Sequence, residues 1–250
     1  MIITVASGKG GVGKSNFVAN LGLALSDFGV NTIVVDANLT NGDLGCILGP
    51  PFPEKTLHDV LSQEATISEA IFEHPVGVKV IPSSMSVDAV SLVNPREISN
   101  LTYVLDDIAD LVLVDAPGTL GENTIESLKI ADKIVLITTP ELTSYSNTLK
   151  TKKLAEKHGL DVLGIVINKV RGNSERIIAD AENWLESKAL CALPYDESVI
   201  DSVESGRPAV RHKPYSRYSI AVRKFAAELA NVEYEPPHPI RLFLANFLNI

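Results

Sequence analysis

A glycine- and lysine-rich stretch near the amino terminus has the composition of a phosphate-binding loop. Residues 8–15 read G-K-G-G-V-G-K-S, which fits the pattern G-x-x-x-x-G-K-[ST]. The glycines let backbone N–H groups turn toward a polyphosphate, the Lys14 amine adds a positive charge, and the Ser15 hydroxyl is suited to Mg²⁺. The sequence therefore predicts that a nucleotide polyphosphate is held by Gly8, Gly10, Gly11, Val12, Gly13, Lys14, Ser15 and Asn16.

The segments on either side of this loop are those that a phosphate site needs. An apolar run, 2–6, comes before the loop, and a helical pattern of apolar residues, 14–28, follows it. The free N–H groups and the positive dipole end of that helix face the same anion. This context distinguishes the motif from a glycine-rich turn that binds nothing.

Two other apolar runs end in aspartate. They are T-I-V-V-D, ending at Asp36, and L-V-L-V-D, ending at Asp115. Ligands of parallel sheets bind at the carboxyl ends of the strands. We therefore expect Ser15, Asp36 and Asp115 to hold Mg²⁺, the carboxylates acting through its waters. A helix cap or a charge on a surface loop is the alternative for either aspartate.

The alternation of apolar runs and helical patterns predicts the fold. We expect an α/β, single-domain P-loop NTPase with a mostly parallel, doubly wound sheet and helices on both faces. Its domain would cover 1–232, followed by a proline-rich linker, 233–239, and a C-terminal amphipathic helix, 240–250. The expected strands are 2–6, 32–36, 78–81, 111–115, 134–138, 162–167 and 189–193. The expected helices within the domain are 14–28, 56–63, 66–73, 95–109, 122–131, 144–158, 174–187, 197–205 and 216–231.

Lys9, the additional lysine of the loop, points to a resemblance to a known family. Lys9 lies too early in the loop to reach its own phosphates from inside. The stretch G-K-G-G-V-G-K-S resembles the deviant Walker A motif of the MinD/ParA family of ATPases, in which the first lysine crosses a dimer interface to the partner's nucleotide. The resemblance implies an ATP-dependent homodimer and catalytic roles for Lys9 and Lys14. A solvated surface lysine is the alternative for Lys9.

This resemblance covers residues 1 to about 230. The MinD-type branch is the nearest, from T-P-E-L-T-S-Y-S-N-T-L-K at 139–150 and the stretch 204–229, and an archaeal-style variant fits. Asp115, in D-A-P-G-T-L-G, lies in a segment that resembles the family's Walker B motif and second switch.

The segment D-A-N-L-T-N-G-D-L-G, which begins at Asp36, resembles the family's first switch. Many members have D-x-D there, whereas this chain has Asn38 in the second position. Asp36 and Asn38 are the catalytic candidates of this segment. An amide orients water but does not accept a proton, so we expect slow hydrolysis and a role for ATP mainly as a switch. Asp43 is near enough in sequence to substitute.

The segment V-I-N-K-V-R-G, 166–172, predicts which nucleobase the ligand carries. Where GTPases have the aspartate of N-K-x-D, this chain has Arg171, which donates hydrogen bonds but does not accept them. Adenine is therefore favoured. The resemblance implies that Asn168 contacts the adenine edge, although a turn residue at the end of a strand is the alternative.

Composition restricts the remaining functions. The chain has 250 residues, a net charge of −9 and two cysteines that form no C-x-x-C pair, which argues against a cysteine metal site and fits a cytoplasmic protein. Six Lys and Arg residues lie between 207 and 224; a solvated helix face is favoured over nucleic acid. One face of 240–250 is apolar, so this helix could bind the inner face of the cell membrane, a protein partner or its own domain.

These observations favour a MinD-like ATPase switch that dimerises with ATP, responds to an activating protein partner and controls placement of a division site or polar complex. A ParA-like DNA-partitioning ATPase is the second hypothesis. A nucleotide-binding adaptor without significant hydrolysis is another, while metallocluster loading would need the paired cysteines that this chain lacks.

Overall fold

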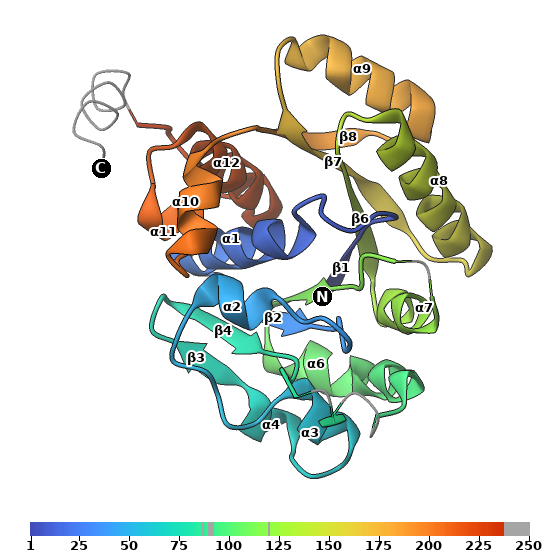
Figure 1. Ribbon diagram of the computed structural model, residues 1–250, viewed down its shortest axis with the longest axis vertical. Coiled ribbons are helices and arrows are strands. Elements are labelled where there is room, and N and C mark those ends of the chain that lie inside the picture. Colours follow the sequence, from blue (N-terminus) through green and yellow to red (C-terminus); the bar gives the residue numbers. More distant parts are fainter. Residues whose placement is uncertain (87, 90–92, 120, 238–250) are drawn as a thin grey trace.

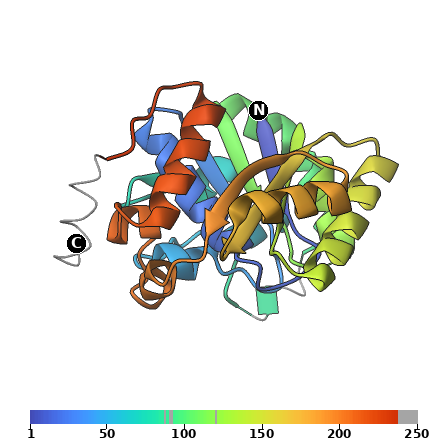
Figure 2. The same cartoon turned by 90° about the horizontal axis from the view of Figure 1, so that it is seen from above.

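The computed structural model describes residues 1–237 except 87, 90–92 and 120, so the expected helix 240–250 lies outside the described residues. Within the described part, one eight-stranded sheet runs through the molecule in the order β3-β4-β2-β5-β1-β6-β7-β8. Helices surround it on both faces (Figure 1 and Figure 2). The strands are β1 Ile2–Ala6, β2 Thr32–Asp36, β3 Phe72–His74, β4 Val78–Ile81, β5 Leu111–Asp115, β6 Lys133–Thr138, β7 Val162–Val170 and β8 Ala189–Pro194.

Every neighbouring pair of strands is parallel except β3 and β4, which are antiparallel. Successive residues of the central strands point to opposite faces of the sheet, and both faces are covered. Leu113 belongs to the core on one face, whereas Val112 and Val114 belong to the core on the other. Burial on both faces explains why these strands read as continuous apolar runs, and the expected fold class is confirmed.

The helices divide between the two faces. The core on one face includes side chains of α1, α2, α11 and α12, and the rings of Phe17 and Phe225 lie 6.0 Å apart where α1 meets α12. The opposite face is covered by α3, α4 and α6 over one half and by α7, α8 and α9 over the other. The bounds are α1 Lys14–Asp27, α2 Leu44–Leu48, α3 Leu57–Leu61, α4 Ile67–Ala70, η1 (3₁₀) Pro95–Leu101, α6 Thr102–Ile108, α7 Glu122–Lys129, α8 Leu142–Lys157, α9 Ser174–Leu185, α10 Ser198–Glu204, α11 Ala209–His212 and α12 Arg217–Ala230.

The structure corrects the sequence expectation at two places. The helix expected over 66–73 ends at Ala70, and β3 follows as an antiparallel edge strand on β4. The short helices α2 and α11 were not expected. Each is held by a side chain outside the helix, because Asp36 accepts a hydrogen bond from the N–H of Leu44 and Asn20 accepts one from the N–H of Val210.

The register of the sheet sets the site. Strands β2 and β5 pair so that Asp36 lies opposite Asp115, and Asp115 also lies beside Val5 of β1. Both carboxylates and the loop that leaves β1 are therefore at the same edge of the sheet. No helix in the described ranges is long and apolar enough to cross a bilayer.

Candidate functional site

The phosphate loop, residues 8–15, connects β1 to the start of α1, and its glycines are required by its geometry. Gly11 and Gly13 have φ values of 77° and 89°, a region that favours glycine. A Cβ atom on Gly13 would lie 2.5 Å from Nδ2 of Asn168, and one on Gly8 would lie 2.1 Å from the backbone oxygen of Asn147. The loop is therefore fitted against α8 and the end of β7.

A cavity of about 340 Å³ lies over this loop. Its volume is within the range of small-molecule sites. The loop lines it from Gly10 to Asn16, together with Lys9, whereas Gly8 does not line it but packs against the backbone of α8. The other lining residues are Ser7, Asn38, Thr40, Asn41, Asp43, Ile47, Gly118 and Thr119.

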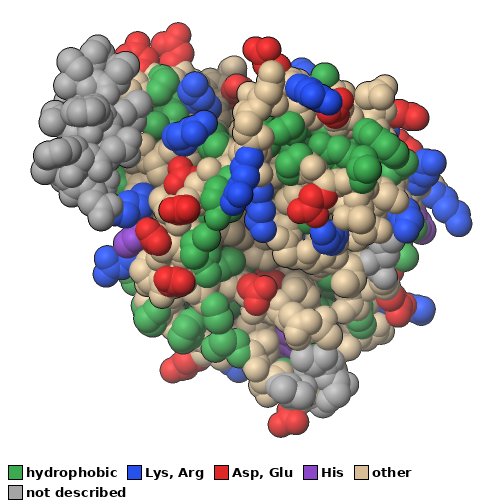
Figure 3. Space-filling view, turned by 45° about the horizontal axis from the view of Figure 1, so that its top comes forward, with side chains coloured by type: hydrophobic (Ala, Val, Ile, Leu, Met, Phe, Trp, Pro, Cys, Tyr) green, Lys and Arg blue, Asp and Glu red, His purple; other side chains and the backbone are tan. Residues whose placement is uncertain are grey.

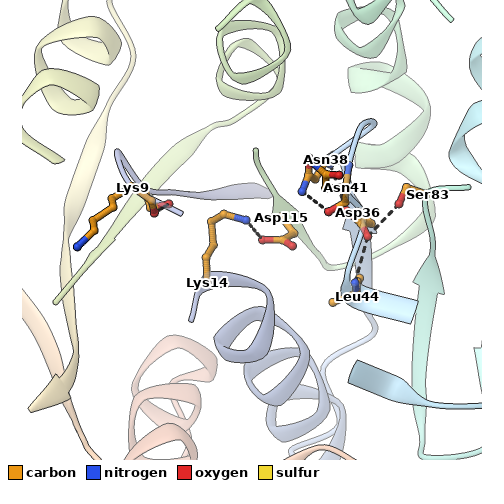
Figure 4. Close-up of polar contacts among 9 residues, drawn as sticks. Lys9, Lys14, Asp36, Asn38, Asn41, Leu44, Ser83 and Asp115 are labelled. Atoms are coloured by element: carbon orange, nitrogen blue, oxygen red, sulfur yellow. Dashed lines mark hydrogen bonds and ion pairs between the residues drawn. The ribbon is translucent and has the colours of Figure 1, made fainter. Parts of the chain in front are cut away.

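Lys14 and Asp115 form a buried ion pair beside the cavity (Figure 4). The exposed fractions of the two side chains are 6% and 0%, so each charge depends on the other for stabilisation. The second carboxylate oxygen of Asp115, Oδ2, is buried and has no hydrogen-bond partner in the described part of the chain. A water ligand of Mg²⁺ would supply the missing donor, so Asp115 and the cavity-lining Ser15 fit an Mg²⁺ site.

Asp36 is buried like Asp115, but its oxygens already have donors. Oδ1 accepts a hydrogen bond from the N–H of Asn38 at 3.1 Å, and Oδ2 accepts from the N–H of Leu44 at 3.2 Å. The Ser83 hydroxyl also donates to Oδ2, at 3.1 Å (Figure 4). Asp36 therefore holds the segment between β2 and α2 in place and lies at the strand end beside Asp115.

Burial and the neighbouring Asp115 carboxylate raise the pKa of Asp36 to about 7, and the N–H donors and Lys14 oppose this rise. In the nucleotide-free protein, the side-chain carboxyl ¹³C resonance of Asp36 is expected to titrate near pH 7. Because this pKa lies above the ordinary 3.8, protonated Asp36 contributes stability that is complete below about pH 4 and is lost as the pH rises through about 7.

Asp115→Asn should lower that NMR midpoint, by on the order of one pH unit, because it removes the like charge. Asp107→Asn, at an exposed position of α6, is the matched control and should leave the midpoint in place. A wild-type midpoint near pH 4 would contradict this account of the buried pair of carboxylates.

Asn38 lines the cavity, but both ends of its side-chain amide are engaged. Nδ2 donates to the backbone oxygen of Asn41, and Oδ1 accepts from the N–H of Asn41 at 3.4 Å (Figure 4). The amide thus closes a turn in the loop between β2 and α2. A catalytic role for Asn38 stays a prediction.

Lys9 points away from the other lysine of the loop (Figure 4). Its Nζ forms an ion pair at 2.8 Å with Glu141, the residue just before α8, and the exposed fractions of the two side chains are 41% and 57%. The hydrogen bond and charge of Lys9 lower the pKa of Glu141. The Lys9 amine therefore lies at the surface, away from the Lys14–Asp115 pair.

A smaller cavity, of about 80 Å³, adjoins the loop at the ends of β7 and β8. Asn168 lines it; its Nδ2 donates to the backbone oxygen of Val12 at 2.8 Å, and its Oδ1 accepts from the N–H of Lys169 at 2.9 Å. Tyr195 lines it as well, and the guanidinium of Arg171 lies 3.6 Å from the centre of the Tyr195 ring. This cavity is the candidate base pocket, with Asn168 joining it to the phosphate loop.

Sequence reasoning missed two residues of this region. The Tyr218 hydroxyl donates to Oδ1 of Asn16 at 3.1 Å, and Asn20 Nδ2 donates to the same oxygen. Burial raises the pKa of Tyr218, which keeps this hydroxyl a donor. Because Tyr218 lies 202 positions from Asn16, no local pattern could have identified the contact.

Comparisons with known proteins agree with this geometry. A family model described as ParA, NUBPL iron-transfer P-loop NTPase, matches residues 1–230. An uncharacterized ATP-binding protein of Methanocaldococcus jannaschii is 33% identical, over 93% of this chain and 89% of that protein. The structure of the septum site-determining protein MinD from Pyrococcus horikoshii, complexed with Mg-ADP, is 32% identical, with a TM-score of 0.85 over 91% of this chain and 95% of that one. The cell division ATPase MinD from Pyrococcus furiosus is 35% identical, with a TM-score of 0.86, and the match covers 92% of this chain and 98% of that one.

Proposed function

The chain belongs to the ParA family of P-loop NTPases, and from this premise we propose that it is a MinD-like ATPase switch that dimerises with ATP and positions a partner in the cell. Its nucleotide is ATP and its metal is Mg²⁺, in keeping with the Mg-ADP complex of the Pyrococcus horikoshii protein. The septum and cell-division roles named for similar proteins support a role in spatial positioning, such as placement of a division site or polar complex.

The observation that carries this proposal is the opposite placement of the two lysines of the loop. Lys14 is buried against Asp115, next to the phosphate cavity, where its amine can bind the β- and γ-phosphates. Lys9 lies at the surface on Glu141, so its amine is available to the nucleotide of a second copy. One lysine thus serves the chain's own ligand and the other serves the partner's.

Nucleotide binding would exchange the counter-charge of Lys14. Its amine would move from Asp115 to the phosphates, and Asp115 would join Ser15 and Asp36 in holding Mg²⁺, which would supply neutralising charge to the phosphates. Asp115 is followed by Gly118 and Thr119, which line the cavity. A change in the partner of Asp115 would therefore shift the segment that follows it, and the position of this segment would depend on whether the γ-phosphate is bound.

Light scattering with three ligand conditions tests the proposal. We expect the mass of a dimer with a non-hydrolysable ATP analogue and the mass of a monomer with ADP or without nucleotide. Single copies under all three conditions would refute the switch.

The domain boundaries and the membrane association are also proposals. We assign 1–232 to the ATPase domain, 233–239 to the linker and 240–250 to an amphipathic helix, on the sequence pattern alone. Two such helices in an ATP-bound dimer would bind a membrane together better than either does alone. Deleting 238–250 should abolish ATP-dependent pelleting with vesicles, and unchanged pelleting would show that this segment packs on protein instead.

A ParA-like role on DNA is the second candidate, and the basic stretch would carry it. Arg211 and Arg223 both contact Asp27, at 3.0 and 2.9 Å, so these two cations are already paired. A hollow of about 590 Å³ is lined by Arg171, Arg217 and Lys224. On the face seen in Figure 3, however, Lys and Arg are interspersed with Asp and Glu, which favours a solvated surface. Salt-sensitive, ATP-dependent DNA binding would distinguish this function.

A further inference from the structure

We propose that Asp43 is the catalytic carboxylate of this ATPase, the group that orients the attacking water and accepts its proton. The inference rests on the proposed ATPase function and assigns to Asp43 the role that the side chain of Asn38 cannot fill. Three features of the structure support it: the position of Asp43 in the cavity, its lack of structural partners and the engagement of Asn38.

Asp43 faces the phosphate cavity. Among the described residues that line this cavity, it is the single carboxylate, the other polar side chains being amines, amides and hydroxyls. It is also exposed, whereas the carboxylates of Asp36 and Asp115 are buried at the strand ends. Only a carboxylate in this set both accepts a hydrogen bond from water and takes its proton at neutral pH.

Asp43 also makes no capping hydrogen bond with its side chain, although it occupies a helix N-cap position. It occupies the N-cap position of α2, where an aspartate side chain usually accepts a hydrogen bond from the first turn of the helix, yet it makes no such bond. The N–H of Leu44 is bound by Asp36 instead, at 3.2 Å. In the part of the chain that the structure describes, the Asp43 carboxylate forms neither an ion pair nor a side-chain hydrogen bond, so it is available to a ligand.

Asn38 is not available in the same way. The two ends of its amide are bound to the backbone of Asn41, and releasing them would open the turn that shapes the loop. Both Asn38 and Asp43 lie on the segment between β2 and α2, and both line the cavity together with Thr40 and Asn41. The carboxylate of Asp43, five positions after Asn38, is therefore free to bind the attacking water, whereas the amide of Asn38 is not.

The proposed step balances as ordinary hydrolysis. The water oxygen forms a bond to the γ-phosphorus, and the bond from that phosphorus to the β–γ bridging oxygen breaks. ADP leaves with the electron pair of that bond. The proton of the water passes to the Asp43 carboxylate and then to the departing phosphate, which restores the carboxylate for the next turnover.

The competing explanation is that Asp43 only repels the triphosphate. A carboxylate beside bound phosphates disfavours their binding through like-charge repulsion, unless a cation such as Mg²⁺ lies between them. The two explanations predict different effects of neutralising Asp43 on ATP affinity and on turnover. Neutralising Asp43 should tighten ATP binding and leave turnover unchanged if repulsion is its only effect, whereas it should stop turnover and leave binding intact if the carboxylate is catalytic.

The decisive experiment exchanges the two side chains. We would compare wild type, Asp43→Asn, Asn38→Asp and the double variant Asn38→Asp/Asp43→Asn, with Asp107→Asn on α6 as the matched control. Single-turnover hydrolysis gives the chemical step, a fluorescent ATP analogue gives the Kd, and light scattering gives the ATP-dependent dimer.

For Asp43→Asn we expect hydrolysis about 100-fold slower, with the Kd within about twofold of wild type and the dimer intact and longer-lived. Asn38→Asp should hydrolyse no faster than wild type, because it loses the amide donor to the backbone oxygen of Asn41, and the double variant should stay as slow as Asp43→Asn. Asp107→Asn should match wild type throughout.

Wild-type turnover in Asp43→Asn would overturn the assignment while leaving the proposed function standing. Loss of binding together with turnover would overturn it too, by showing that Asp43 holds the loop or the metal. If the wild-type protein neither dimerises nor hydrolyses ATP, the proposed function itself fails, and this inference fails with it.

Discussion

Lys14→Met is expected to destabilise the nucleotide-free protein by about 3–5 kcal/mol, in addition to weakening ATP binding by at least about 100-fold. The reason lies in the buried ion pair. Lys14 and Asp115 are almost fully shielded from water, Lys14 pairs with Oδ1 of Asp115, and Oδ2 has no hydrogen-bond partner in the described part of the chain. Removing the amine leaves a buried carboxylate without a counter-charge, which costs far more than the loss of a surface ion pair.

Urea unfolding without nucleotide and equilibrium binding of ATP measure the two effects separately. The control is Lys14→Met/Asp115→Asn, in which both charges are absent. This double variant should regain most of the lost stability, because no unpaired charge remains buried, yet it should still fail to bind ATP. If Lys14→Met alone unfolds at the wild-type urea concentration, then Lys14 and Asp115 are not paired in solution.

Lys9→Ala is expected to weaken the ATP-dependent dimer by at least about 100-fold while leaving ATP affinity of the monomer close to wild type. The substitution removes a cation that we propose to be desolvated against the partner's phosphates. In the free monomer it removes only an exposed contact with Glu141, so the fold should be little affected.

Light scattering across a range of protein concentrations, with a non-hydrolysable ATP analogue, measures this loss. The matched control is Glu141→Gln, which removes the ionic partner of Lys9 within the chain but keeps the amine. That variant should dimerise at least as well as wild type, since the amine leaves Glu141 more readily. A Lys9→Ala protein that dimerises normally would show that the interface does not depend on this lysine.

The sheet and the phosphate loop could be predicted from the sequence because their signals are local. Continuous apolar runs mark strands buried on both faces, and the glycine and lysine spacing from Gly8 to Ser15 is set by the anion it surrounds. The aspartates at the ends of β2 and β5 follow from the same logic, and the register places them side by side.

The features that were not predicted depend on contacts that the local pattern of apolar and polar residues does not show. Helix α2 begins where Asp36 binds the N–H of Leu44, and this same contact leaves the Asp43 side chain without a capping task. The edge strand β3 exists because β4 offers it a partner. The pairing of Lys9 with Glu141 joins residues 132 positions apart, so a resemblance could suggest where the amine goes but not what holds it in the monomer.

The contacts around Asn168 have a consequence for ligand selectivity. Its Nδ2 and the Lys169 amine both bind backbone oxygens of the phosphate loop, at Val12 and Gly11, while the same Asn168 borders the candidate base pocket. The base and the phosphates of a nucleotide would thus be bound by residues that are hydrogen-bonded directly to one another. A nucleotide with a purine that fits the base pocket poorly would displace Asn168 and so weaken binding of its own phosphates. Selectivity between bases would therefore appear as a difference in affinity for the whole nucleotide.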